Sequence, residues 1–255
     1  FVLGESRGEP LEVVGQVRNF MVNESIHAAR FIGDRGFVIT FRFVDPLFTF
    51  DLSDPQAPRQ VGELEVPGVS TYLHPYGADQ LIGVGRRAEQ QAWRSDLQLQ
   101  LFDVSTLATP QVLDTVVIGE PDQWSWSIAA VNPHAFTLFG DVLSLPVGIS
   151  SGNYYDALSG FLVYRMDPAG GFTPIGRVDH KQEDDGSGSG CPPVNDGSTA
   201  PCSTFAPVRF NAPLRSVVLE EVSGRTVLYT LSEGFLKADA VGDTLTPIQA
   251  VPLAQ

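Results

Sequence analysis

One unit recurs along this chain: an apolar segment, a polar turn and a second segment in which apolar and polar residues alternate. Two clear copies are residues 48–66 (FTFDLSDPQAPRQVGELEV) and 99–118 (LQLFDVSTLATPQVLDTVVI). Weaker copies are residues 161–179 and 235–253, and a shortened copy is found at residues 1–17. Self-similarity at a spacing of this size is typical of repeat architectures. The repeat therefore constrains the fold more than any other feature.

The spacing of the copies predicts the type of repeat. Matching apolar positions are Val14, Val61, Leu113, Ile175 and Ile248, which are 47, 52, 62 and 73 residues apart. A four-stranded propeller blade takes about 40–50 residues, and longer intervals indicate inserted loops. We therefore predict an all-β chain, a β-propeller of four-stranded antiparallel blades, with four full blades and a partial N-terminal one. Residues 1–255 would form a single propeller domain or the C-terminal part of one.

Apolar alternation and turn residues divide each full copy into four short strands, and no segment keeps a helical period. The expected strands are 28–33, 37–43, 47–52 and 60–66; then 70–76, 81–85, 97–103 and 111–118; then 135–139, 142–147, 160–165 and 172–178; and finally 216–222, 226–232, 234–240 and 246–253. The first copy contains only strands 1–4 and 11–17. We expect a preceding segment of the same protein to supply its other strands.

The charge of the chain restricts its partners. Thirty acidic residues against 16 basic ones give a net charge of −14. This balance argues against nucleic acid, because phosphate binding needs a basic surface, and against adsorption to anionic membranes. No apolar run approaches the roughly 18 residues of a membrane span. A soluble surface kept apart by self-repulsion is the simplest interpretation of the charge.

The two cysteines, Cys191 and Cys202, lie close together in an acidic insertion rich in Gly and Ser, residues 181–205. A disulfide closing this loop would remove about 3 kcal/mol of unfolded-chain entropy in the simple loop model. We predict this disulfide and, with it, an extracellular or periplasmic protein. Two free thiols are the alternative.

A long segment resembles a known family. Residues 24–85, from ESIHAARFIGDRG to QLIGVG, together with LFDVS at 101–105 and RTVLYTLSEGFLKADAV at 225–241, are similar to secreted bacterial and archaeal proteins. These carry a C-terminal β-propeller domain distantly related to WD repeats, and their function is uncharacterised. The resemblance implies a propeller and an exported protein, but no activity. Where that family tends to read His-Lys-Ala-Phe, this chain has Pro133-His134-Ala135-Phe136, so no role transfers to His134.

Polar residues of the first strand in each copy are candidates for a central channel. Alignment of the copies places His27, Ser70, His134 and Arg215 at similar heights. His27 and His134 could hold a transition metal together with waters. The competing interpretation is that each binds a backbone carbonyl or channel water. We expect His74, which precedes Pro75, to fix a turn.

The other motifs are weaker indicators of function. Gly186-Ser187-Gly188-Ser189-Gly190 has the spacing of a nucleophile elbow, but the strand before it and the helix after it are missing. Oxygen ligands at 183–185 and 195–196 would suit calcium, although they lack the spacing of an EF-hand loop, and disorder pinned by the disulfide is preferred. His180 lies at the mouth of this insertion. Aromatic residues in or near loops suggest a recognition surface or blade packing: Trp93, Trp124, Trp126, Tyr154 and Tyr155.

These observations together favour an exported, non-catalytic propeller that acts as a binding scaffold for a protein or glycan partner, with no cofactor. The alternative is a metal-dependent hydrolase with its site in the central channel, built on His27 and His134.

Overall fold

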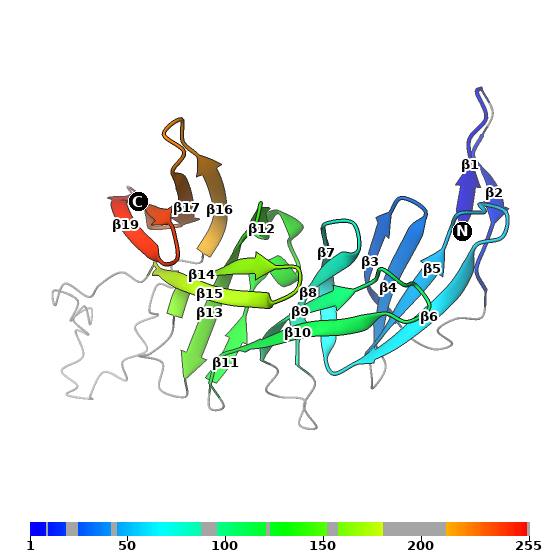
Figure 1. Cartoon of the computed structure of the whole chain (residues 1–255), viewed down its shortest axis with the longest axis horizontal. Helices are drawn as coiled ribbons and strands as arrows, with labels where there is room; N and C mark the ends of the chain where they lie inside the picture. Colours follow the sequence, from blue (N-terminus) through cyan, green and yellow to red (C-terminus); the bar gives the residue numbers. More distant parts are fainter. Residues whose placement is uncertain are drawn as a thin grey trace, which may run out of the picture.

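The computed structural model describes residues 1–8, 10–18, 25–41, 45–87, 96–120, 123–151, 158–180 and 213–253. These residues form antiparallel sheets that stand side by side in chain order, with the two ends of the chain at opposite ends of an open row (Figure 1). Two short 3-10 turns, Ile128–Ala130 (η1) and Pro133–Ala135 (η2), are the only helical segments of this part. None of its helices could cross a bilayer.

Four of the sheets are blades, and a two-stranded sheet precedes them. The two-stranded sheet contains β1 (Val2–Gly4) and β2 (Glu12–Gly15). The first full blade contains β3 (Ser25–Ile32), β4 (Arg35–Phe41), β5 (Asp45–Asp51) and β6 (Arg59–Val66). The second contains β7 (Val69–Tyr76), β8 (Gln80–Arg86), β9 (Leu97–Asp103) and β10 (Gln111–Ile118).

The third blade contains β11 (Gln123–Trp126), β12 (Thr137–Phe139), β13 (Val142–Ser151), β14 (Leu158–Asp167) and β15 (Gly171–Asp179). The fourth contains β16 (Pro213–Glu220), β17 (Thr226–Ser232), β18 (Phe235–Val241) and β19 (Leu245–Pro252). Every neighbouring pair is antiparallel, as alternation and turn chemistry predicted. The all-β class and the four-stranded blades are thus confirmed.

The first strand of the third blade differs from its prediction. A single strand was expected at 135–139, but β11 and β12 both pair with β13, at Trp126↔Gly148 and at Phe139↔Val142 respectively. The ten residues between β11 and β12 contain η1 and η2, so Ala135 lies in a 3-10 turn. The side chains of Ser127 and Asn132 accept hydrogen bonds from the backbone N–H groups of Ala129 and His134, which favours a turn over continued strand.

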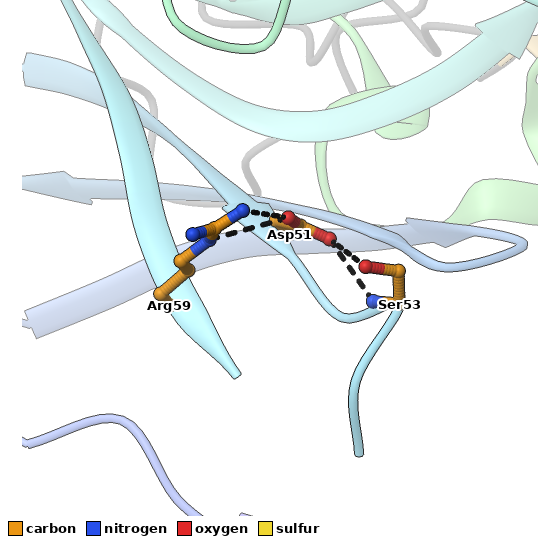
Figure 2. A network of polar contacts seen from close by, with 3 residues as sticks. All are labelled: Asp51, Ser53 and Arg59. Carbon is orange, nitrogen blue, oxygen red and sulfur yellow. Dashed lines mark hydrogen bonds and ion pairs between the residues drawn. The ribbon is translucent and has the colours of Figure 1, made fainter. Parts of the chain in front are cut away.

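An aspartate closes the third strand of three blades. The carboxylates of Asp51, Asp103 and Asp167 each accept a hydrogen bond from the backbone N–H two residues later, at 3.0, 2.8 and 2.9 Å. This is an Asx turn, which Asp favours because its short side chain reaches its own backbone. At Asp51 the hydroxyl of Ser53 and the guanidinium of Arg59 also donate to the carboxylate (Figure 2). These bonds lower the pKa of Asp51 to about 2.

Three apolar clusters join the four blades in sequence. Each blade presents alternate residues to its two neighbours, as strand geometry requires. The cluster between the first and second blades includes Phe37 and Phe102. The cluster between the second and third blades is the largest and includes Leu99 and Leu143, while a smaller one joins the third blade to the fourth.

The two-stranded N-terminal sheet is poorly covered. Leu3, Leu11 and Val13 are 53%, 61% and 57% exposed. Val17, just beyond β2, packs against the buried Val38 and Phe48 of the first full blade. The incomplete first copy predicted from the sequence is thus a separate two-strand element among the described residues. The insertion 181–205 and the predicted Cys191–Cys202 disulfide lie outside the described residues.

Candidate binding site between the first strands

The first strands of the blades approach one another and are tied by hydrogen bonds. Strands β3 and β7 lie against each other, as do β12 and β16. The hydroxyl of Thr71 on β7 donates to the carbonyl of Ala130 at 2.7 Å, and that of Thr137 on β12 donates to the carbonyl of Ser216 at 2.8 Å. Side chains from successive blades therefore meet along this edge.

A polar and aromatic cluster lies where the first three blades meet. The guanidinium carbon of Arg30, on β3, is 6.0 Å from the ring centroid of Tyr72, on β7. The Tyr72 hydroxyl and His74 Nδ1 are 2.8 Å apart and share a hydrogen bond. Phe136, which follows η2, packs on His74 with ring centroids 4.5 Å apart, and on Tyr72 at 5.4 Å. Three different blades contribute to this cluster.

Burial and the Arg30 charge determine the ionisation of the cluster. Burial, followed by the positive charge of Arg30, lowers the pKa of His74 to about 4. Burial also raises the pKa of Tyr72, although the charge of Arg30 and a side-chain hydrogen bond with Arg30 act in the opposite direction. At neutral pH the histidine and the tyrosine are therefore uncharged, and Arg30 carries the charge of the cluster.

Arg30 differs from several other arginines in its pairing. Its Nε atom is buried and has no hydrogen-bond partner in the part of the chain that the structure describes. By contrast, four arginines form ion pairs with carboxylates: Arg35 with Asp79, Arg59 with Asp51, Arg165 with Asp141, and Arg225 with Glu221. Arg30 also shares a hydrogen bond with the side chain of Tyr72, which is neutral and does not balance its charge. A cation that is partly removed from water is costly unless its charge is paired. Arg30 is therefore suited to an incoming anion.

A second histidine is engaged in a polar contact between the third and fourth blades. His180, just after β15, is fully buried. Its Nδ1 and Nε2 atoms each lie 2.8 Å from a hydroxyl of β17, those of Ser232 and Thr230 respectively. Burial, followed by the nearby Lys237 charge, lowers the pKa of His180 to about 4. The neutral ring thus links the blades and has both nitrogens occupied.

The repeated four-stranded sheets, stacked in chain order with their first strands together, have a counterpart among known proteins. The model of the beta propeller domain family matches residues 1–243. The chain belongs to this family.

Two archaeal relatives of this propeller are uncharacterised proteins. One, from Archaeoglobus fulgidus, is 42% identical over 55% of this chain and 21% of its own length. The other, from Methanocaldococcus jannaschii, is 38% identical over 49% of this chain and 19% of its own length. The chain thus spans about a fifth of the length of these relatives.

A solved structure with a similar arrangement is the periplasmic gluconolactonase of Pseudomonas aeruginosa. It is 10% identical over 86% of this chain and 69% of its own, with a TM-score of 0.34. At this level the similarity carries no information on the activity of this propeller.

His27 and His134, the two candidate ligands for a metal, lie in different blades. His27 is exposed on β3 at an irregularity in its pairing with β4, and His134 is exposed in η2, outside any strand. The second blade, β7–β10, lies between their blades in chain order. No group of three or more His, Cys, Asp or Glu side chains able to hold a metal occurs among the described residues. The metal site remains a prediction.

The other sequence candidates have separate surroundings in the propeller. Ser70 is buried, with its hydroxyl 3.4 Å from Gln100 Oε1. Arg215 is exposed on β16. Trp124, on β11, is 50% exposed, and the ring of Trp126 lies over Gly148, where a side chain would collide with it. Trp93, Tyr154 and Tyr155, the calcium candidate and the discarded Gly-x-Ser-x-Gly segment lie outside the described residues.

The sequence patterns did not indicate Arg30 or Tyr72. His74 lies within β7, inside the predicted strand 70–76, but it is half-buried and bonded to Tyr72 instead of fixing a turn. Pro75 is tolerated after it because β7 is an edge strand. A usable signal was the Tyr-x-His spacing, which places both side chains on one face of a strand.

Proposed function

We propose that this chain is an exported binding scaffold, not a catalyst, and that its open blade faces bind further blades of the same protein. The uncovered apolar face of the fourth blade carries this proposal. Export is supported by the resemblance to secreted proteins and by the predicted Cys191–Cys202 disulfide. The buried His180 is better suited to a structural role than to catalysis, because both of its ring nitrogens contact hydroxyls.

The register of the fourth blade separates its two faces. Val218 and Leu228 are opposite each other and buried against the third blade. On the other face, Leu231, Leu236 and Val251 are aligned across β17, β18 and β19. Leu236 and Val251 are 37% and 41% exposed.

The same outward face continues onto β16. Val217 and Leu219 alternate with the buried Val218 and are 51% and 50% exposed. At each of the three contacts between consecutive blades, the apolar face of one blade is covered by its neighbour. Val227, opposite Leu219 on this face, is fully buried, so the exposed part of the face consists of Val217, Leu219, Leu236 and Val251. Exposed apolar residues gathered on one sheet face favour an interaction site. The chemistry that fits it is another apolar blade face, as at the interfaces within the chain.

The N-terminal end offers a second open surface. Besides Leu3, Leu11 and Val13 of the two-stranded element, Ile26 and Phe31 of β3 are 58% and 65% exposed. Joining the fourth blade of one copy to the N-terminal end of another would cover both open surfaces of the purified chain. Such a head-to-tail contact generates a ring or an open chain of molecules. In a longer polypeptide, additional blades would occupy the same two faces.

Analytical ultracentrifugation over a range of concentrations tests the proposal. The purified chain is expected to self-associate, and Leu219→Glu is expected to shift it towards monomer because a charge cannot be buried in an apolar contact. Leu113→Glu is the matched control, since Leu113 is 43% exposed on the outermost strand of the second blade. This control should associate as the parent chain does.

Two results would overturn the proposal. The first is a parent chain that stays monomeric at all concentrations. The second is a stoichiometric transition metal in the purified protein, which would favour the channel hydrolase over the scaffold.

A further inference from the structure

The Arg30–Tyr72–His74–Phe136 cluster has features of a ligand site that are independent of the open blade faces. Its members come from β3, β7 and the segment after η2, so the site exists only when three blades are assembled. It lies at the first strands, where the blades converge. We propose that this cluster binds the carboxylate of a small organic acid, with Arg30 as the anion-binding residue.

The first support is the state of Arg30. The guanidinium presents five N–H donors in a planar fork that matches two carboxylate oxygens. Its buried Nε has no hydrogen-bond partner among the described residues, although donors on buried groups are normally satisfied.

The second support is the surroundings of Arg30. The guanidinium carbon of Arg30 lies over the Tyr72 ring, 6.0 Å from its centroid, and the two side chains share a hydrogen bond. A cation placed over an aromatic face is attracted by the ring quadrupole, which favours this orientation. A carboxylate bound beside such a face gains more from the charge than it would in bulk water, because the local dielectric is lower.

The uncharged part of the cluster also favours a carboxylate ligand. His74 is held by the Tyr72 hydroxyl and packed on Phe136, with ring centroids 4.5 Å apart. Neutral at physiological pH, it adds no competing anion and no second cation. Arg30 alone therefore determines the sign of the ligand, while the rings of Tyr72, His74 and Phe136 provide an apolar flank for its body.

The experiment uses two acids and their neutral counterparts as probes. Benzoate and benzamide represent an aromatic ligand, and galacturonate and galactose represent a sugar ligand. Each is titrated into the ¹⁵N-labelled chain while the Arg30 Nε–H and His74 ring signals are followed by NMR. Saturable shifts are expected with at least one of the acids and not with its neutral counterpart. The acid that binds more tightly identifies the source of the carboxylate.

Three variants test whether binding depends on Arg30 itself or only on the overall charge of the chain. Arg30→Gln is expected to weaken binding about tenfold or more, the size of a lost charge-assisted pair. Arg177→Gln, which removes the same charge from an exposed position on β15, should bind as the parent chain does. Arg30→Lys keeps the charge but loses the fork, and should bind less tightly than the parent while remaining folded.

Three outcomes would overturn the proposal. One is equal binding of the acids and their neutral counterparts. Another is equal binding by the parent chain and by either Arg30→Gln or Arg30→Lys with an unchanged melting temperature. The third is the absence of a saturable shift with either acid. None of these outcomes bears on self-association, so the two proposals fail independently.

Discussion

Two interfaces between neighbouring blades use different chemistry. The second and third blades meet through 16 buried residues that are almost all apolar, including Leu99, Leu101 and Leu143. The third and fourth blades meet through seven, and beside them lies His180 with its two hydroxyl partners. The first interface depends mainly on apolar packing, although His74 packs on Phe136 and the Asp114 carboxylate accepts a hydrogen bond from the Phe172 backbone N–H there. The second depends more on its histidine, because His180 is fully buried and both of its ring nitrogens contact hydroxyls. We therefore expect the second interface to be the more sensitive to acid.

The largest expected effect is a loss of packing at the apolar interface. Leu99 is fully buried on β9 and lies in the large cluster. Leu99→Ala should lower the free energy of unfolding by about 2–5 kcal/mol, because it removes buried methyl groups and leaves a cavity. Urea denaturation measures the change, which should be the same at pH 7 and pH 5. A marked pH dependence of the difference would contradict the comparison.

The next largest effect on stability is expected at the interface between the third and fourth blades, at neutral pH. His180→Ala leaves the hydroxyls of Thr230 and Ser232 without their ring partner. The Ser232 hydroxyl keeps its hydrogen bonds with the backbone N–H groups of Gly234 and Phe235, whereas the Thr230 hydroxyl loses its ring partner. The expected loss is about 2–3 kcal/mol in urea denaturation, from this unsatisfied buried group and a cavity. His134→Ala, at an exposed turn, is the control and should change stability by less than about 0.5 kcal/mol. Equal effects of the two substitutions would show that His180 does not hold the blades together.

A third prediction is that mild acid weakens the parent chain. The pKa of His180 falls from 6.5 to about 4 on folding, so between these values the unfolded chain binds more protons than the folded one. Stability is therefore complete above about pH 6.5 and declines as the pH falls towards 4. At pH 5 the loss from this group is roughly 2 kcal/mol. His74 shifts in the same direction.

His180→Gln separates the contribution of His180 from that of His74. The glutamine does not titrate in this range, so the slope of unfolding free energy against pH between 6.5 and 5 should become shallower. An unchanged slope would assign the acid sensitivity to other groups.

The smallest expected effect is in an exposed turn. The pKa of Asp51 is lowered from 3.8 to about 2, first by the Ser53 hydroxyl and then by Arg59. Its contribution is therefore present above about pH 4 and is lost as the pH falls towards 2. Asp51→Asn should lower the melting temperature slightly at neutral pH, by less than any substitution above. Asp243→Asn, in another exposed turn, should leave it unchanged.

The repeat predicted most of the fold because short-range patterns determine these strands. The predicted strands 97–103, 111–118 and 226–232 match β9, β10 and β17, whose flanking turns are sharply marked by polar residues. β11 was missed because its four residues alternate Gln, Trp, Ser and Trp and resemble a loop. Its pairing with β13 depends on the distant segment 148–151.

The candidate site was less predictable, for a related reason. Arg30 and Tyr72 are 42 positions apart and belong to different blades, so only the packing of β3 on β7 brings them together. A histidine before a proline also resembles a turn in sequence, whereas the edge position of β7 tolerates it within a strand. Contacts between repeats are thus where single-sequence reasoning has least information.

The open row of blades also has a consequence for cooperativity. Among the described residues, the three apolar clusters between blades each join blades that are consecutive in the chain, so stability is approximately a sum of single-blade terms and nearest-neighbour terms. The second and third blades have full neighbours on both sides, while the fourth has one. Amide hydrogen exchange should therefore be slowest in β8, β9 and β14 and fastest in β1, β2 and β19, as local opening proceeds inward from both ends of the row.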